Sequence, residues 1–176
     1  TTTKRDDAAK SDLIIEAAPE DINLKREIFA SLSALSAPDA ILATNTSSLS
    51  ITSIASAAQG PERVVGLHFF NPAQIMKLLE VVRCVTTSEE ALVFALEFGQ
   101  RLGKLTVQTK DKAGFIVNRL LVPYMLDAIR AYEEGVGSIA EIDHAMKAGA
   151  AHPMGPLALC DLIGLDTLGL ICDGLY

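Results

Sequence analysis

The chain has 176 residues, of which 49% are hydrophobic and 21% charged, and its formal net charge is −7. This composition suits one good-sized core or two small ones, and an acidic chain with scattered basic residues argues against a nucleic-acid partner. No apolar run is long enough to cross a membrane, and no secretory signal is visible. The three cysteines form no close pair and lack zinc-type spacing, so we expect a reduced, cytoplasmic protein without a disulfide or a metal site.

The first part of the chain alternates short apolar runs with helical patterns. Leu24, Ile28, Leu32 and Leu35 stand at helical spacing, and a hydroxyl-rich segment leads into a short helix after residue 50. A third helix is expected at 87–103, where a Thr/Ser cap and early acids are closed by Gly103. Strands are expected at 12–18, 40–44, 63–69, 77–82 and 105–109. Short apolar strands alternating with helices imply a mostly parallel sheet.

The second part of the chain predicts helices only. A long helical pattern covers 117–131, and Ser138 with Glu141 forms a capping box for the next helix. A turn at 152–156 precedes two short helices divided near Gly164. The expected organisation is therefore an α/β domain at 1–110 followed by an all-helical domain at 111–176.

Polar side chains follow three of the expected strands at their carboxyl ends. The first strand runs into Glu20, the second into Asn45, Thr46, Ser47 and Ser48, and the third into His68 and Asn71. In open α/β sheets, ligands bind outside the carboxyl ends of the strands. These residues are therefore the candidates for a binding or catalytic site.

The stretch "GLHFFNPAQIMKLLEVV" at 66–82 is apolar almost throughout, yet it carries His68 and Glu80. A buried carboxylate is costly without a partner, and a histidine across an Asn-Pro bend supplies one. A carboxylate that holds an imidazole raises its basicity and fixes its tautomer, which suits base chemistry near neutral pH. The alternatives are a hydrogen-bonded structural His68 and an outward-facing Glu80 on an edge strand.

Other polar residues carry weaker signals. The "NTSS" segment at 45–48 is also typical of a helix cap, and Asn118 is also typical of an exposed helical position. His144 is expected on a solvated helix face, and His152 in a turn. No two His or Cys residues stand at metal-ligand spacing.

Four motifs in series, "NTSSLSI", the stretch at 66–82, "DKAGFIVNRLLVPY" and "AHPMGPLALCDLIGLD", resemble the 3-hydroxyacyl-CoA dehydrogenases over essentially the whole chain. The resemblance is strongest to single-function bacterial members that act on 3-hydroxybutyryl-CoA. It implies an oxidoreductase of fatty acid metabolism that interconverts 3-hydroxyacyl-CoA and 3-oxoacyl-CoA with NAD. It also implies the second half of a Rossmann domain, followed by a helical domain that forms a homodimer.

The resemblance also implies roles for individual residues. His68 corresponds to the general base and Glu80 to the carboxylate that orients it. Ser47 corresponds to a serine between substrate hydroxyl and nicotinamide, and Asn118 to an asparagine that holds substrate oxygens. The positions that correspond to the cofactor side of the family site are Glu20, Lys25, Asn45 and Ser47.

One departure from the family pattern concerns the cofactor. The family begins with a strand, a glycine-rich turn and a helix that hold the pyrophosphate, and no G-x-G-x-x-G occurs in these 176 residues. We therefore expect a fragment, and the alternative to an active enzyme is a non-catalytic chain that dimerises and binds acyl-CoA but not NAD. A related β-hydroxyacid dehydrogenase is disfavoured because those enzymes typically use a lysine base. The sequence leaves open NAD against NADP, the acyl chain length and the physiological direction.

Overall fold

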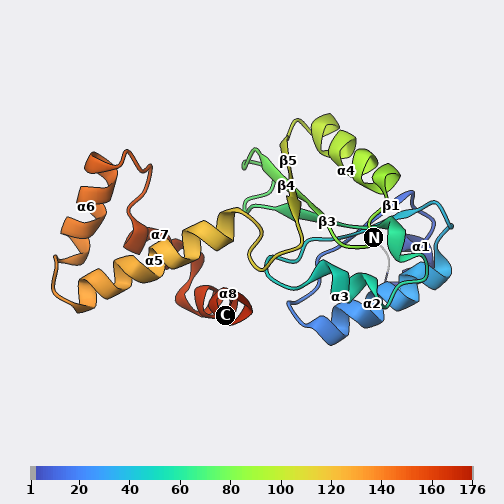
Figure 1. The fold of residues 1–176 in the computed structure, drawn as a ribbon, viewed down its shortest axis with the longest axis horizontal. Coiled ribbons are helices and arrows are strands. Elements are labelled where there is room, and N and C mark those ends of the chain that lie inside the picture. The colour runs from blue at the N-terminus through green and yellow to red at the C-terminus, as the bar shows by residue number, and fades with distance from the viewer. Residues whose placement is uncertain (1–2, 176) are drawn as a thin grey trace. The chain divides into compact units, whose positions relative to one another are not determined.

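A computed structural model describes residues 3–175 of the protein. The chain divides between Phe115 and Ile116 into two compact units (Figure 1). The elements of the first unit are α1 (Arg5–Ala8), β1 (Leu13–Glu16), α2 (Ile22–Leu35), β2 (Ile41–Thr44), α3 (Ile51–Ala55), a 3-10 turn (Pro61–Arg63), β3 (Val64–Phe69), β4 (Leu78–Arg83), α4 (Glu89–Arg101) and β5 (Leu105–Lys110). All five expected strands are present, whereas α1 and the 3-10 turn were not predicted, because neither carries an apolar periodicity.

The five strands form one sheet in the order β1-β2-β3-β4-β5. The pairs β1–β2, β2–β3 and β4–β5 are parallel, and β3–β4 is antiparallel. The prediction of a mostly parallel sheet is confirmed. Because β4 lies between β3 and β5, the alternative of Glu80 on an edge strand is wrong.

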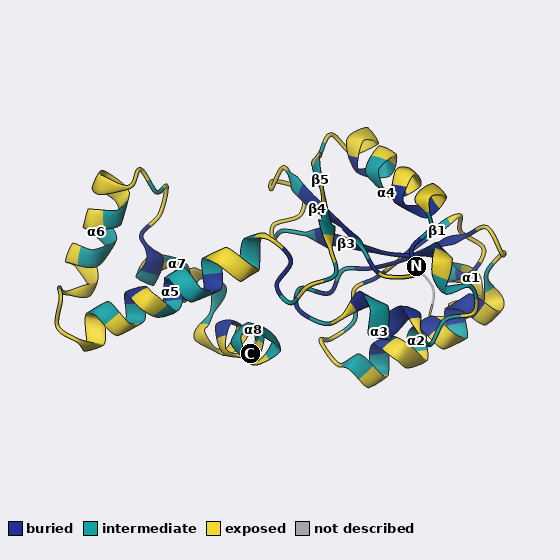
Figure 2. Ribbon diagram, in the orientation of Figure 1, coloured by how far each residue is buried: buried dark blue, intermediate teal, exposed yellow. Residues whose placement is uncertain are grey.

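Helices cover both faces of the sheet (Figure 1), and the strands between them are mostly buried (Figure 2). On one face, Phe29 of α2 and Ile51 and Ile54 of α3 pack with side chains of β1, β2 and β3. On the other face, Leu92 and Ala95 of α4 pack with the alternate residues of the strands. This two-sided burial explains why the strands are continuous apolar runs, and it makes each charged residue in them conspicuous.

Arg63 fixes one end of this unit. Its side chain is buried, and its guanidinium donates to the backbone carbonyls of Ser33, Ala37, Ala40 and Gln59. These carbonyls belong to the end of α2 and to the connections that follow α2 and α3. The planar guanidinium carries five N–H donors, so one residue satisfies several carbonyls that secondary structure leaves open.

The helix ends follow the chemistry expected from the sequence. Ser88 accepts a hydrogen bond from Ala91 N at the start of α4, and Gly103 adopts a φ of 72° just beyond its end. That backbone conformation strongly favours glycine, so this position stops the helix.

The second unit is entirely helical, as predicted. It consists of α5 (Val117–Glu133), α6 (Ile139–Gly149), α7 (Pro156–Ile163) and α8 (Leu165–Leu175). The capping box of Ser138 and Glu141 at the start of α6 is confirmed. Its core combines Val122 and Met125 of α5 with Cys160 of α7 and Leu168 of α8. None of the helices within residues 3–175 combines the length and the hydropathy that a membrane crossing requires.

Candidate active site

His68 and Glu80 form a buried pair at the centre of the sheet. They are direct partners in the antiparallel register of β3 and β4, and Nδ1 of His68 lies 2.7 Å from Oε2 of Glu80. The exposed fractions of the two residues are 3% and 1%, so water does not screen the contact. Because a carboxylate only accepts, Nδ1 carries the proton that it donates, and Nε2 is left as the accepting nitrogen of the ring.

Two aromatic rings flank the imidazole. The ring centroid of Phe70 lies 4.6 Å from that of His68, and the ring of Phe115 meets it edge-on at 5.4 Å. Phe115 is buried and adopts a φ of 48°, which is uncommon for a side chain of this size. Backbone strain of this kind persists where the surroundings determine it, and it concentrates at functional sites.

Glu20 holds the segment that follows β2. Its Oε1 accepts hydrogen bonds from Thr46 Oγ1 at 2.6 Å, Ser47 N at 2.7 Å and Ser48 N at 3.2 Å. Burial by itself would raise the pKa of Glu20, but these hydrogen bonds and the charge of Lys25 together hold the pKa below its ordinary value of 4.5. The carboxylate is therefore ionised at neutral pH.

A second carboxylate, Glu16, stands behind this segment at the end of β1. Its Oε2 accepts from Thr44 Oγ1 at 2.7 Å, and its Oε1 accepts from Lys25 Nζ at 2.7 Å. Lys25 also donates to Ala18 O and lies 3.4 Å from Glu20 Oε2. One ammonium thus bridges the two carboxylates at the carboxyl ends of β1 and β2.

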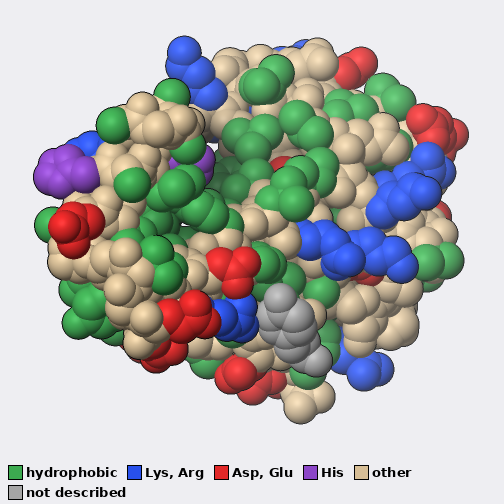
Figure 3. All heavy atoms as spheres, turned by 60° about the vertical axis from the view of Figure 1, so that its left-hand side comes forward, with side chains coloured by type: hydrophobic (Ala, Val, Ile, Leu, Met, Phe, Trp, Pro, Cys, Tyr) green, Lys and Arg blue, Asp and Glu red, His purple; other side chains and the backbone are tan. Residues whose placement is uncertain are grey.

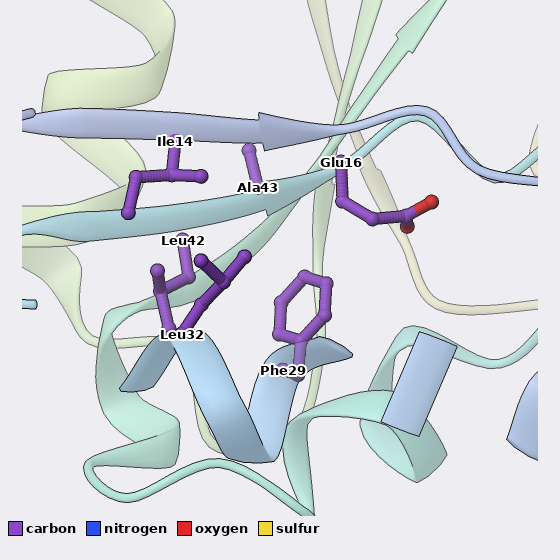
Figure 4. A pocket seen from close by; sticks show the side chains of 6 residues that line it. All are labelled: Ile14, Glu16, Phe29, Leu32, Leu42 and Ala43. Carbon is purple, nitrogen blue, oxygen red and sulfur yellow. The ribbon is translucent and has the colours of Figure 1, made fainter. Parts of the chain in front are cut away.

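A small gap that does not admit a water molecule lies beside Glu16, between α2 and the first two strands (Figure 4). Its remaining lining is apolar and includes Ile14, Phe29 and Leu32. The Glu16 carboxylate is directed away from the aliphatic side chains (Figure 4). In these apolar surroundings, the ion pair with Lys25 and the hydrogen bonds from Thr44 Oγ1 and Ala18 N compensate for burying the charge.

Asn45 links the polar segment to the strand that bears His68. Its Oδ1 accepts a hydrogen bond of 2.9 Å from the backbone N–H of Phe69, the residue after His68. The first unit therefore brings Glu20, Lys25 and Asn45–Ser48 into one hydrogen-bonded network at the ends of β1, β2 and β3. The "NTSS" segment does not cap α3, because Ser50 is the capping residue.

The remaining candidates lie in the second unit. Asn118 is half-buried on the first turn of α5. His144 is exposed, as expected, and His152 is half-buried with its Nδ1 3.3 Å from the hydroxyl of Tyr124. Within the described range, no cluster of His, Cys, Asp and Glu has the geometry of a metal site.

Sequence reasoning missed Glu16 and the two flanking rings. The signal for Glu16 was present, because a carboxylate within the apolar run "DLIIEAA" requires a buried partner for the same reason as Glu80. Phe70 and Phe115 carried no such signal, since an aromatic residue is ordinary core composition. The contact of Phe115 with His68 depends on tertiary folding over 47 positions of sequence.

The two strand-to-helix connections at this edge do not fit a cofactor pyrophosphate. Residues 17–21 and 45–50 are "AAPED" and "NTSSLS", and neither connection contains glycine. Close approach of a pyrophosphate to a helix N-terminus depends on a glycine turn. The residues present therefore supply polar groups beside His68 but no cradle for the phosphates.

A mostly parallel sheet with helices on both faces and polar side chains at the strand ends defines a Rossmann-type domain, and here a helical domain follows it. Residues 1–112 match the model of the 3-hydroxyacyl-CoA dehydrogenase NAD binding domain, and residues 114–176 match that of the C-terminal domain. The chain belongs to the 3-hydroxyacyl-CoA dehydrogenase family, in which NAD is the cofactor.

Similar proteins support this assignment over the whole length of the chain. The 3-hydroxybutyryl-CoA dehydrogenase of Clostridioides difficile is 49% identical over 176 residues, which are 100% of this chain and 63% of that protein. Human mitochondrial hydroxyacyl-coenzyme A dehydrogenase is 51% identical over 164 residues, covering 93% of this chain and 52% of that protein. The crystal structure of FadB2 from Mycobacterium tuberculosis has a TM-score of 0.97 at 49% identity, covering 99% of this chain and 62% of that chain. The chain thus spans between half and two thirds of the length of these relatives.

Proposed function

We propose that the chain carries the proton-transfer site of an NAD-dependent 3-hydroxyacyl-CoA dehydrogenase. The observation that carries this proposal is the buried contact of 2.7 Å between His68 Nδ1 and Glu80 Oε2. It fixes the ring as the tautomer whose Nε2 accepts a proton. Membership of the family supplies the substrate class, an acyl-CoA with a hydroxyl at C3.

In this reaction, Nε2 of His68 takes the proton of the 3-hydroxyl, and the Glu80 carboxylate stabilises the resulting imidazolium. NAD supplies the hydride acceptor. The rings of Phe70 and Phe115 exclude water from the imidazole faces, which strengthens its interaction with Glu80. Ser47 and Asn118 orient the substrate oxygens, and Asn45 and Glu20 organise the cofactor side.

The test uses a chimera in which the glycine-rich unit that begins the family precedes the 176 residues. We expect this chimera to oxidise NADH with acetoacetyl-CoA, and we expect His68→Gln to lower kcat by about 10² to 10⁴, the range that general base catalysis contributes. The matched control is His144→Gln, which alters an exposed histidine. Activity of His68→Gln within about tenfold of the unmodified chimera contradicts the proposal.

A second candidate is a chain that binds acyl-CoA and dimerises without turnover. Calorimetric titration of the 176 residues with NAD and with acetoacetyl-CoA measures which ligands they bind, and turnover by the chimera separates the two candidates. Weak or undetectable NAD binding is expected, because the backbone donors for a pyrophosphate are missing. Micromolar NAD binding by these residues refutes this expectation. A chimera that binds both ligands but does not turn over supports the second candidate.

A homodimer through the helical unit is part of the proposal. Large apolar side chains lie at the surface of the protein (Figure 3), and in the second unit they include Leu120, Leu162, Leu165 and Leu170. Each of these four is more than 60% exposed, so their side chains are available to a partner subunit. Light scattering at tens of micromolar should give twice the mass of the chain, and a monomer at that concentration contradicts the dimer.

The proposed compartment is reducing, such as the cytoplasm. Cys84, Cys160 and Cys172 form no disulfide in the structure, and the first two are buried. Burial raises the pKa of the Cys160 thiol, and the nearby carboxylates of Asp161 and Asp143 add to this shift. A raised pKa keeps the thiol protonated and unreactive, so labelling with an impermeant thiol reagent under native conditions should spare Cys160.

A further inference from the structure

Lys25 is the most completely buried charged residue at the ends of the strands. Only 1% of Lys25 is exposed, although the next residue on α2, Arg26, is exposed. Its ammonium faces Glu16 Oε1 at 2.7 Å, Ala18 O at 2.9 Å and Glu20 Oε2 at 3.4 Å. The contacts with Glu16 and Ala18 are hydrogen bonds, and the contact with Glu20 is an ion pair.

The two carboxylates that Lys25 bridges hold the segment 44–48 at both of its ends. Glu16 accepts from the hydroxyl of Thr44 at 2.7 Å, and Glu20 accepts from the backbone N–H groups of Ser47 and Ser48. Each carboxylate therefore presents one oxygen to Lys25 and the other to the segment. Without the cation, the buried carboxylate of Glu16 would lose its counter-ion, which is costly in an apolar surrounding.

The segment in turn touches the strand of the proposed base. Asn45 lies between the two held ends, and its Oδ1 accepts from Phe69 N, the residue adjacent to His68. A continuous series of polar contacts thus runs from Lys25 through the carboxylates and the segment to the end of β3. The contacts span α2, β1, β2 and β3, and each is within hydrogen-bonding or ion-pairing distance.

We propose that Lys25 is a positioning residue, which holds the Glu16 and Glu20 carboxylates so that the segment 44–48 has a fixed conformation beside His68. This role rests on the proposed function, in which Asn45 and Ser47 serve the site. A buried ion pair is a poor source of net stability, but it specifies geometry.

The test is amide hydrogen exchange of the 176-residue chain by NMR, without any ligand. In Lys25→Met, we expect exchange at Ser47 and Ser48 to accelerate by about tenfold more than at the core amides of Val65 and Val81, because the segment opens locally. The matched control is Arg26→Met on the same helix. It should leave the ratio between segment and core amides unchanged, since Arg26 is exposed.

A second variant guards against a failure of Lys25→Met to fold. Glu16→Gln combined with Lys25→Met removes both buried charges, and the glutamine oxygen still accepts from Thr44. This double variant should retain the core protection and still show the faster exchange at Ser47 and Ser48. Equal acceleration of segment and core amides, or no acceleration in either variant, overturns the positioning role. Because no substrate is used, failure here is distinct from failure of the dehydrogenase activity.

Discussion

Replacing Glu80 with glutamine keeps the size of the side chain and removes its charge. The structure gives the amide two ways to meet Nδ1 of His68. If its oxygen accepts, the geometry survives, but the imidazolium formed during proton transfer has no counter-ion in a site that is 1% exposed at Glu80. If its NH₂ group donates, the ring must adopt the other tautomer, and Nε2 no longer accepts a proton.

The magnitude follows from the burial of the pair. Leaving one member of a buried pair uncompensated costs about 3–5 kcal/mol, and here that cost falls on the state in which His68 is charged. Because each 1.36 kcal/mol changes a rate about tenfold, kcat should fall by about 10² to 10⁴. The ground state, with a neutral imidazole, is affected less, so the KM for the acyl-CoA should change little.

The assay follows NADH absorbance with acetoacetyl-CoA in the chimera described above. Glu97→Gln is the control, since Glu97 is exposed on α4. Imidazole ¹⁵N shifts of the 176-residue chain supply a readout that is independent of turnover, and they should show a protonated Nδ1 in the unmodified protein. A kcat for Glu80→Gln within about tenfold of the chimera, with the fold intact, refutes the reasoning.

Three further predictions concern the stability of the first unit and of α8. Arg63→Met should lower the free energy of unfolding by about 3 kcal/mol, because buried carbonyls lose their donor, whereas the exposed Arg101→Met should change it by less than about 0.5 kcal/mol in urea titrations. Gly66→Ala should destabilise the protein by about 1–3 kcal/mol through overpacking, because the added Cβ would lie 2.7 Å from a Val82 carbon. Gly169→Ala lies in open space within α8 and should stabilise the protein by about 1 kcal/mol. A melting temperature that is higher for Gly66→Ala than for Gly169→Ala would contradict this. Because the folded-state pKa of Glu20 lies below 4.5, its contribution is complete above that pH and is lost as pH falls through the folded pKa. The protection factor of the Ser48 amide, which refers its exchange rate to the intrinsic rate at the same pH, should therefore fall in acid, and Glu20→Gln should remove that dependence.

The order of strands and helices was predictable from the sequence because local signals coincide with the tertiary structure. The capping box at Ser138, the stop at Gly103 and the continuous apolar strands each have a cause within a few residues. The short helix at Arg5–Ala8 was not predictable, because none of its residues is buried and no apolar period marks it.

The candidate site was predictable where charge and burial conflict within one run of residues. Glu80 stood out because its neighbours are apolar, and the same argument applied to Glu16 would have indicated its pairing with a cation. Lys25 gave no such signal, since a lysine within a helix usually faces solvent, and its burial depends on the packing of α2 over the ends of β1 and β2. Its pairing with two carboxylates depends on tertiary distances that no local pattern encodes.

The antiparallel pairing of β3 and β4 makes the spacing of His68 and Glu80 independent of the connection between the two strands. His68 and Glu80 are opposite each other in the ladder, so the hydrogen bonds of the strands set their spacing rather than the connection between them. Residues 71–77 of that connection are exposed. Insertions or exchanges at its tip therefore leave the proton-transfer pair in register. The paired strands, and not residues 71–77, therefore set the geometry of the proton-transfer pair.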